Sequence, residues 1–296
     1  MKLFEVYPLY DVQPTRAKDV YVYDAEGTAY LDLYGGHAVI SIGHSHPHYV
    51  QSLHEQLDNI AFYSNAIQNP WQQKLADAIG EHSCLHDYQL FMCSSGAEAI
   101  ENALKMASFH TGKKRVLAFK GAFHGRTSAA VAVTDNQKII APLNAQQAVC
   151  FVPFEDHQAV EKELQKGDVC AVIFEPIQGV GGLDTPSKEF IIQLERLCQH
   201  YNTCLIADEV QSGFSRSGTF FAFQNTSIKP HIITMAKGMG NGFPVGGILI
   251  HPDLKAQYGL LGTTFGENDL SCPWSLAVMD VFKRDKLQQH AGQLEQ

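Results

Sequence analysis

The feature that most constrains the fold is a repeated alternation of short apolar strands with helical patterns between Pro70 and Leu261. Strand-like apolar segments occur at 115–119, 169–174, 204–206 and 232–235, with helical patterns such as 190–200 between them. Strands joined through helices pair in parallel, and strands that are apolar throughout are buried on both faces. The sequence therefore predicts an α/β fold with a mostly parallel sheet between helices.

The composition excludes several classes of protein. Lys and Arg number 22 against 31 Asp and Glu, giving a net charge of −9, and the basic run 113–115 is too short to form a nucleic-acid-binding face. The seven cysteines form no Cys-x-x-Cys pair and lie mostly in apolar runs, which is typical of reduced cysteines in the cytoplasm. No apolar run approaches the roughly 20 residues of a membrane span. We expect a cytoplasmic protein with neither nucleic-acid nor membrane partners.

Lys237 lies in an apolar turn flanked by glycine, within Thr234-Met235-Ala236-Lys237-Gly238-Met239-Gly240. Burial disfavours the ammonium form of lysine, so such an amine is nucleophilic near neutral pH. The neighbouring glycines let a flat ring approach the backbone. The motif is typical of a lysine that forms a Schiff base with an aldehyde cofactor; the alternative is a surface lysine where a strand meets a loop.

An anion-binding turn is predicted earlier in the chain. Residues 88–93 read as a strand, 94–97 as a tight turn and 98–109 as a helix. Backbone N–H groups and the helix dipole at such a turn favour a phosphate. The alternative is an ordinary helix start in which Ser95 and Glu98 form a capping box.

Asp208 directly follows an apolar strand, at the sheet edge where open α/β sheets bind ligands. A carboxylate there can keep a pyridine nitrogen protonated, which makes the ring an electron sink. Gln211 is close enough to reach a phenolic oxygen on the same ring. The alternative is that Asp208 and Glu209 only cap the next helix.

Phe123 and Arg126 stand among small residues after another predicted strand. Phe123 is suited to stacking on a pyridine ring, and Arg126 to bidentate capture of a substrate carboxylate. The alternatives are a core aromatic and an arginine paired with a surface acid.

Taken together, these segments resemble the class III (fold type I) pyridoxal-phosphate aminotransferases, and most closely the acetylornithine and succinylornithine aminotransferases. The resemblance covers nearly the whole chain. The motifs that carry it are 31–39, 43–47, 95–99, 123–127, 175–179, 208–213 and 262–266.

The resemblance implies pyridoxal 5'-phosphate as the cofactor and a homodimer with shared active sites. It makes Lys237 the catalytic residue that carries the cofactor, Asp208 the partner of the ring nitrogen and Gln211 the partner of the phenolic oxygen. The other implied contacts are Phe123 with the ring, Gly96 and Ala97 with the phosphate, Thr264 with the phosphate in the other subunit, and Arg126 and Thr263 with the substrate.

The resemblance also implies a domain organisation. We expect residues 1–65, with a hairpin formed by 20–23 and 30–33, to join a smaller α+β domain. Residues 66–272 would form the cofactor-binding large domain. Residues 273–296 would form a helix that leads toward a C-terminal lobe, which in relatives supplies an arginine for the substrate α-carboxylate and which we expect to be absent here.

Two further positions depart from the family pattern. Val180 stands where the family has a glutamate that gates this arginine, so that charge switch cannot operate in the usual way. Trp274 stands among positions that are small in the family, and we expect it to disturb close packing there.

The function implied is transfer of the terminal amino group of an N-acylornithine, acetyl or succinyl, to 2-oxoglutarate in arginine biosynthesis. The alternatives are another ω-aminotransferase, acting on ornithine or 4-aminobutyrate, and a truncated non-catalytic subunit. A metal site at the alternating histidines His44, His46 and His48 is disfavoured, because no matching cysteine or carboxylate set accompanies them.

Overall fold

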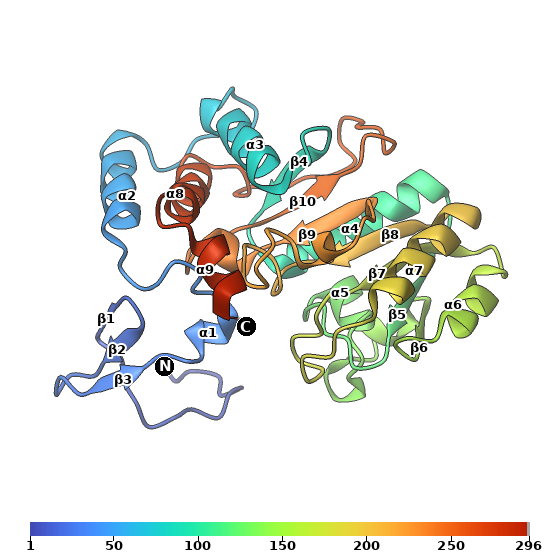
Figure 1. The fold of residues 1–296 in the computed structure, drawn as a ribbon, viewed down its shortest axis with the longest axis horizontal. Helices are drawn as coiled ribbons and strands as arrows, with labels where there is room; N and C mark the ends of the chain where they lie inside the picture. Colours follow the sequence, from blue (N-terminus) through green and yellow to red (C-terminus); the bar gives the residue numbers. More distant parts are fainter. Residues whose placement is uncertain (295–296) are drawn as a thin grey trace.

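The centre of the molecule is a mostly parallel sheet. In the computed structural model, which describes residues 1–294, it has seven strands in the order β4-β10-β9-β8-β7-β5-β6 (Figure 1). All the neighbouring pairs from β9 to β6 are parallel, and only β10 runs against its two neighbours. The predicted mostly parallel sheet is confirmed. The strands are β4 Gln89–Cys93, β5 Arg115–Phe119, β6 Val149–Val152, β7 Val169–Phe174, β8 Cys204–Asp208, β9 Ile232–Met235 and β10 Gly246–Ile250.

Helices cover both faces of the sheet because its strands are apolar on both sides. In β5, Leu117 and Phe119 join one core cluster, whereas Val116 and Ala118 join the other. Each fully buried side chain of Leu or Phe size stabilises the fold by about 1.5–3 kcal/mol. The second cluster contains α4 (Gly96–Thr111), and the first contains residues of α3 (Pro70–Ser83), α6 (His157–Leu164), α7 (Lys188–His200) and α8 (Ser271–Arg284).

The sequence analysis missed β10, the strand that breaks the parallel order. β10 begins with Gly246 and Gly247, so the usual strand pattern is absent from its first residues. It follows β9 after a short glycine-rich turn, which leaves no room for a crossover, and the two strands pair antiparallel. This reversal places β4, and with it the start of α4, beside the turn that carries Lys237.

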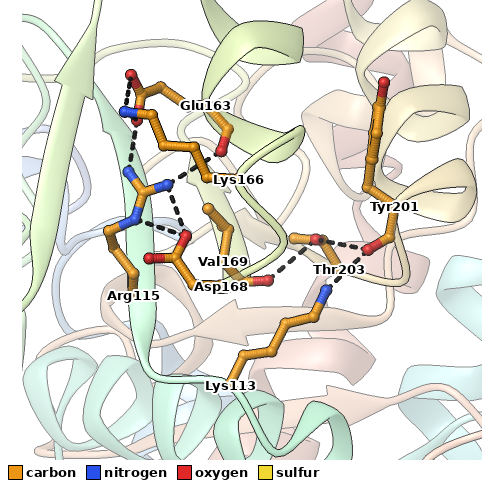
Figure 2. A network of polar contacts seen from close by, with 8 residues as sticks. All are labelled: Lys113, Arg115, Glu163, Lys166, Asp168, Val169, Tyr201 and Thr203. Atoms are coloured by element: carbon orange, nitrogen blue, oxygen red, sulfur yellow. Dashed lines mark hydrogen bonds and ion pairs between the residues drawn. The ribbon is translucent and has the colours of Figure 1, made fainter.

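Polar contacts tie the amino ends of the parallel strands together (Figure 2). Arg115 lies at the start of β5. Its Nε and Nη2 donate to Asp168 Oδ1 at 2.9 and 2.7 Å, and its Nη1 donates to Glu163 Oε2 at 2.5 Å. Lys113 Nζ donates to the carbonyl of Tyr201 at 2.8 Å, and Thr203 Oγ1 donates to that of Val169 at 3.0 Å. This end of the sheet is closed by structural contacts, which leaves the carboxyl ends for a ligand.

The N-terminal part forms a small sheet of its own (lower left in Figure 1). The predicted hairpin is confirmed as β2 (Tyr21–Tyr23) and β3 (Ala29–Leu31), and β1 (Arg16–Lys18) adds a strand that was not predicted. A short left-handed turn follows (α1, Gly35–Ala38), in which His37 and Ala38 have φ of 62° and 59°.

The N-terminal part is attached to the central domain through the turn after β9. Asn241 Oδ1 accepts from the backbone N–H of Ser41 at 2.8 Å and of Ile42 at 3.1 Å, and its Nδ2 donates to the carbonyl of Gly43 at 3.0 Å. Tyr49, in α2 (Pro47–Asn59), donates to the carbonyl of Gly240 at 2.8 Å. The predicted domain boundaries themselves stay a prediction.

The expected single helix over 273–296 is wrong within the described residues. Two helices, α8 and α9 (Leu287–Leu294), are separated at Lys286, whose φ of 53° is left-handed and cannot continue a right-handed helix. Residues 295 and 296, also part of that prediction, lie outside the described residues. None of the helices within 1–294 has the length and apolar character to cross a membrane.

Candidate active site

A cavity of about 370 Å³ opens at the carboxyl ends of β8 and β9, beside the N-terminus of α4. Open α/β sheets bind ligands at this edge, because loops diverge there and helix N-termini point toward it. The cavity brings together residues that are far apart in the sequence. Its lining includes Val39, Ser94–Ala97, Phe123–Gly125, Glu175, Val180, Asp208, Val210, Gln211, Ala236, Lys237 and 242–245.

Lys237 is the first residue of a short 3-10 turn (Lys237–Met239) that begins two residues after the end of β9, and it lines the cavity. Its φ of 45° is uncommon for a residue with a side chain and is a type of strain that concentrates at functional sites. No hydrogen bond or ion pair holds its amine within residues 1–294. Burial lowers the pKa of this amine, although Asp208 and Glu175 act in the opposite direction. A partly desolvated amine is what Schiff-base chemistry requires.

Asp208 ends β8, and its carboxylate is held from three directions. Oδ1 accepts from Thr234 Oγ1 and from the N–H of Val210, both at 3.0 Å, and Oδ2 lies 2.6 Å from His124 Nδ1. The side chain is 4% exposed. A carboxylate fixed in this way at a cavity wall is suited to holding a protonated ring nitrogen.

The first turn of α4 presents free backbone N–H groups to the cavity. The N–H of Glu98 is used by Ser95 Oγ at 3.2 Å, and Glu98 Oε2 accepts from the N–H of Ser94 at 2.6 Å. The N–H groups of Gly96 and Ala97 have no partner within residues 1–294. The capping contact and the anion-binding interpretation are thus compatible, because the cap leaves these two donors available.

Gly96 also packs too closely for a side chain. An added Cβ would lie 2.8 Å from Cγ1 of Val210 and 3.3 Å from the Cβ of Ala236. The backbone of Gly96 therefore fits against the two segments that carry Asp208 and Lys237, and this contact holds the predicted phosphate turn in place.

Phe123, Val210 and Gln211 form the side walls of the cavity. The N–H of Phe123 donates to Glu175 Oε1 at 2.9 Å, and the N–H of Gly179 donates to Glu175 Oε2 at 3.0 Å. The Gln211 amide lies directly against Gly179, where an added Cβ would overlap its Oε1. The structure thus places both predicted ring contacts, Phe123 and Gln211, beside Asp208.

The structure does not bring Arg126, Thr263 and Thr264 into the cavity lining. Arg126 and Thr264 are exposed, and Arg126 has no ion pair within residues 1–294. Thr263 Oγ1 accepts from the N–H of Gly266 at 3.2 Å, in the loop between β10 and α8. Their assignment to the substrate and to the other subunit therefore stays a prediction.

The sequence analysis assigned no role to three residues at the cavity: His124, Glu175 and Val210. Burial is the main cause that raises the pKa of the Glu175 carboxyl, with Asp208 adding and His124 opposing. Glu175 directly follows β7, and Asp208 is the last residue of β8. An acidic residue at the end of an apolar strand was therefore a signal that could have identified Glu175 as a cavity residue. For Val210 the only signal was its place between Asp208 and Gln211.

Both departures from the family pattern lie at or near the cavity. Val180 lines it and is 66% exposed, so an apolar side chain stands at the mouth. Trp274 packs behind the wall, with its ring centroid 3.7 Å from that of Phe243. The indole N–H of Trp274 is buried and has no hydrogen-bond partner within residues 1–294, and the expected disturbance of packing stays a prediction.

The alternating histidines each contact a different aspartate. His44 pairs with Asp32 at 2.7 Å, His46 with Asp285 at 3.1 Å and His48 with Asp280 at 3.3 Å. Within residues 1–294 no three His, Cys, Asp or Glu side chains form a cluster suited to a metal ion. His46 and His48 link the start of α2 to α8 and its C-terminal end, whereas His44 contacts an aspartate just after β3.

The polar and apolar groups that line this cavity match those of pyridoxal phosphate. Free N–H groups at Gly96 and Ala97 match its phosphate, the fixed Asp208 carboxylate its ring nitrogen, and the unpaired Lys237 amine its aldehyde. Apolar side chains of Phe123 and Val210 match the faces of a flat ring.

Comparisons with known proteins agree with this assignment. The family model described as "Aminotransferase class-III" matches residues 5–296. The acetylornithine aminotransferase of Archaeoglobus fulgidus is 38% identical over 295 residues, covering 99% of this chain and 78% of that protein. That of Bacillus subtilis is 38% identical and covers 98% and 76%. Among solved structures, acetylornithine aminotransferase from Elizabethkingia anophelis superposes with a TM-score of 0.84 at 29% identity, covering 98% and 72%. Ornithine aminotransferase from Toxoplasma gondii superposes with a TM-score of 0.91 at 26% identity, covering 97% and 71%.

Proposed function

This chain belongs to the class III aminotransferases, a family of enzymes that use pyridoxal 5'-phosphate, and we propose that it transfers the terminal amino group of an N-acylornithine to 2-oxoglutarate in arginine biosynthesis. The observation that carries the chemistry is the Lys237 amine, which is partly desolvated, has no partner within residues 1–294 and shares its cavity with Asp208. The choice of substrate is supported by the names of the relatives, which share 34–39% of their residues with nearly the whole chain.

Each of the following cavity residues would have a separate role in binding or proton transfer. Gly96 and Ala97 bind the phosphate, Phe123 and Val210 contact the ring, and Asp208 keeps the ring nitrogen protonated. When bound, the cofactor supplies an electron sink for the negative charge left on the substrate carbon. Lys237 Nζ, with its lowered pKa, would take the proton from that carbon as a general base and deliver it to the cofactor as a general acid.

Absorbance spectroscopy tests this proposal. We expect the purified chain with pyridoxal phosphate to show a visible band that bleaches when N-acetylornithine is added and returns with 2-oxoglutarate. N-succinylornithine, free ornithine and 4-aminobutyrate serve as competing donors at equal concentration. A protein that bleaches faster with a free ω-amine would overturn the substrate assignment, and a folded protein with no visible band would overturn the assignment of Lys237.

We further propose that two copies of the chain share their active sites, with Thr264 of one copy at the phosphate bound by the other. The exposure of Thr264, away from the cavity of its own chain, supports this arrangement. Lys237→Ala and Thr264→Asp, each inactive alone, would then complement when mixed as subunits, because one site of each hybrid dimer carries both native residues. Activity should recover to roughly a quarter of the native value. No recovery in hybrids of proven composition would contradict the sharing of sites.

We place the reaction in the cytoplasm. The seven cysteines are all free, and most are buried, which suits a reducing compartment. Fractionation of cells that express the protein should recover it with cytoplasmic markers, and recovery from an exported fraction would contradict this placement.

A further inference from the structure

His124 forms a buried pair with Asp208 that no role assigned so far explains. Its side chain has no exposed surface, and Nδ1 lies 2.6 Å from Asp208 Oδ2. The second ring nitrogen, Nε2, is also buried and has no partner within residues 1–294. Within residues 1–294, the imidazole of His124 therefore makes its hydrogen bond to Asp208 alone.

The surroundings of His124 favour its charged form. Burial alone lowers the pKa of an imidazole, but the hydrogen bond to Asp208 and the charges of Asp208 and Glu175 outweigh it, so that the pKa of His124 is raised. The remaining titratable group that lines the cavity is Lys237, whose pKa is lowered by burial. A buried carboxylate is stable only when paired, and an imidazolium provides that pair.

The imidazole differs in kind from the other donors to Asp208. Thr234 Oγ1 and the N–H of Val210 give neutral hydrogen bonds to Oδ1, both at 3.0 Å. The contact from His124 to Oδ2 is shorter, as hydrogen bonds between ions are. The segment 123–125 also places Phe123 at the cavity, so the ring wall and the charged donor arrive on one loop.

We propose that His124 is a positioning residue that, as an imidazolium, keeps the Asp208 carboxylate ionised and fixed so that Asp208 can hold a proton on the ring nitrogen of the cofactor. This inference rests on the proposed function, since it takes Asp208 as the partner of that nitrogen. It adds that the negative charge at the cavity is set by a buried ion pair, not by Asp208 alone.

The first test observes the protonation of His124 directly. The protein is labelled with nitrogen-15 histidine, and the signals of His124 are assigned by their loss in His124→Asn. We expect both ring nitrogens to be protonated at neutral pH, above the ordinary pKa of an imidazole, with and without the cofactor. A neutral His124 near pH 7 overturns the inference, and this result does not depend on whether the chain has aminotransferase activity.

The second test separates charge from hydrogen bonding. His124→Asn keeps a donor near Asp208 but removes the charge, His124→Phe removes both, and Thr234→Val removes a neutral hydrogen bond to the same carboxylate. We expect both His124 variants to weaken cofactor binding and to lower kcat by about tenfold or more, because a charged contact is lost, and Thr234→Val to change either by less than about threefold. The visible band of both His124 variants should also titrate at a different pH.

The outcomes distinguish the inference from the function on which it rests. Full rescue by His124→Asn, in kcat and in the titration of the visible band, would show that a hydrogen bond suffices and would overturn the role of charge. Absence of the visible band in the native protein would instead count against the proposed function, while the nitrogen-15 measurement would still decide the state of His124.

Discussion

The inner and outer walls of the cavity are built in different ways. On the inner wall, Asp208 accepts three hydrogen bonds and Gly96 packs against Val210 and Ala236, all within one chain. On the outer side, Val180 is largely exposed and Arg126 has no ion pair within residues 1–294. The side of the cavity around Asp208 is thus held together by contacts within one chain, whereas the side around Val180 and Arg126 is not organised by such contacts.

Loss of the amine on the inner wall should have the largest effect. Lys237→Ala removes the group proposed to carry the cofactor and move the proton, so kcat for N-acetylornithine should fall by at least about 10³-fold, within the range of general acid–base catalysis. Lys188→Ala, an exposed lysine at the start of α7, is the matched control. Retained turnover in Lys237→Ala would show that the inner wall does not supply the reacting amine.

A side chain at Gly96 should weaken the inner wall without touching the chemistry. In Gly96→Ala the new Cβ lies 2.8 Å from Val210, and such overpacking costs about 1–3 kcal/mol. We expect the dissociation constant of pyridoxal phosphate, measured by equilibrium dialysis, to rise roughly ten- to hundredfold. The control is Gly292→Ala, where the nearest atom to an added Cβ is the Cα of Gly218 at 4.0 Å. Unchanged cofactor affinity would argue against the phosphate turn.

A substitution on the outer side should change the KM of the substrate and not the binding of the cofactor. Arg126→Ala removes an exposed charge, and a hydrogen bond to a charged group contributes about 1.5–3 kcal/mol, so the KM of a carboxylate substrate should rise about tenfold or more. The visible spectrum of the bound cofactor should not change. Arg196→Ala on α7 is the matched control. A change in the spectrum, with KM unaltered, would place Arg126 on the inner wall.

A buried acid next to the inner wall should produce the smallest effect, one on stability. Burial raises the pKa of Glu209 to about 7, although Ser212 and the N–H of Phe223 donate to it at 2.6 and 2.8 Å. Because the folded state holds this proton more tightly than the unfolded state, the stabilisation is complete below the usual glutamate pKa and is lost as pH rises through about 7.

Glu209→Gln should therefore flatten this part of the pH dependence. Urea unfolding at about pH 5 and pH 8 should show a fall in stability with pH that is smaller in the variant than in the native protein by about 1–3 kcal/mol. Glu189→Gln, at an exposed position on α7, should leave the slope as it is. Equal slopes for all three proteins would mean that Glu209 does not change its proton affinity on folding.

The sequence predicted the inner wall well because its signals are local. Asp208 follows an apolar strand, and Lys237 stands in a glycine-flanked turn, so the sheet topology alone brings both to one edge. The same logic predicted the four parallel strands β5, β7, β8 and β9, whose apolar runs are continuous.

What the sequence could not predict depends on contacts between distant segments or on a single backbone angle. His124 and Asp208 are 84 residues apart, and no pattern in either segment indicates that they pair. The break at Lys286 has neither glycine nor proline to mark it. The position of Thr264 outside the cavity follows from the path of the loop between β10 and α8, which no periodicity describes.

The hydrogen bonds of Asn241 have a consequence for how the chain is made. They join residues 198–200 positions apart, so the N-terminal segment has no place to dock until the turn after β9 has left the ribosome. Synthesis adds roughly 5–20 residues per second, so the turn that binds the N-terminal segment is made on the order of 10–40 seconds after that segment. Leu31 and Leu33, at 54% and 89% exposed even after docking, remain accessible throughout that interval, so this segment can meet other apolar chains while synthesis continues.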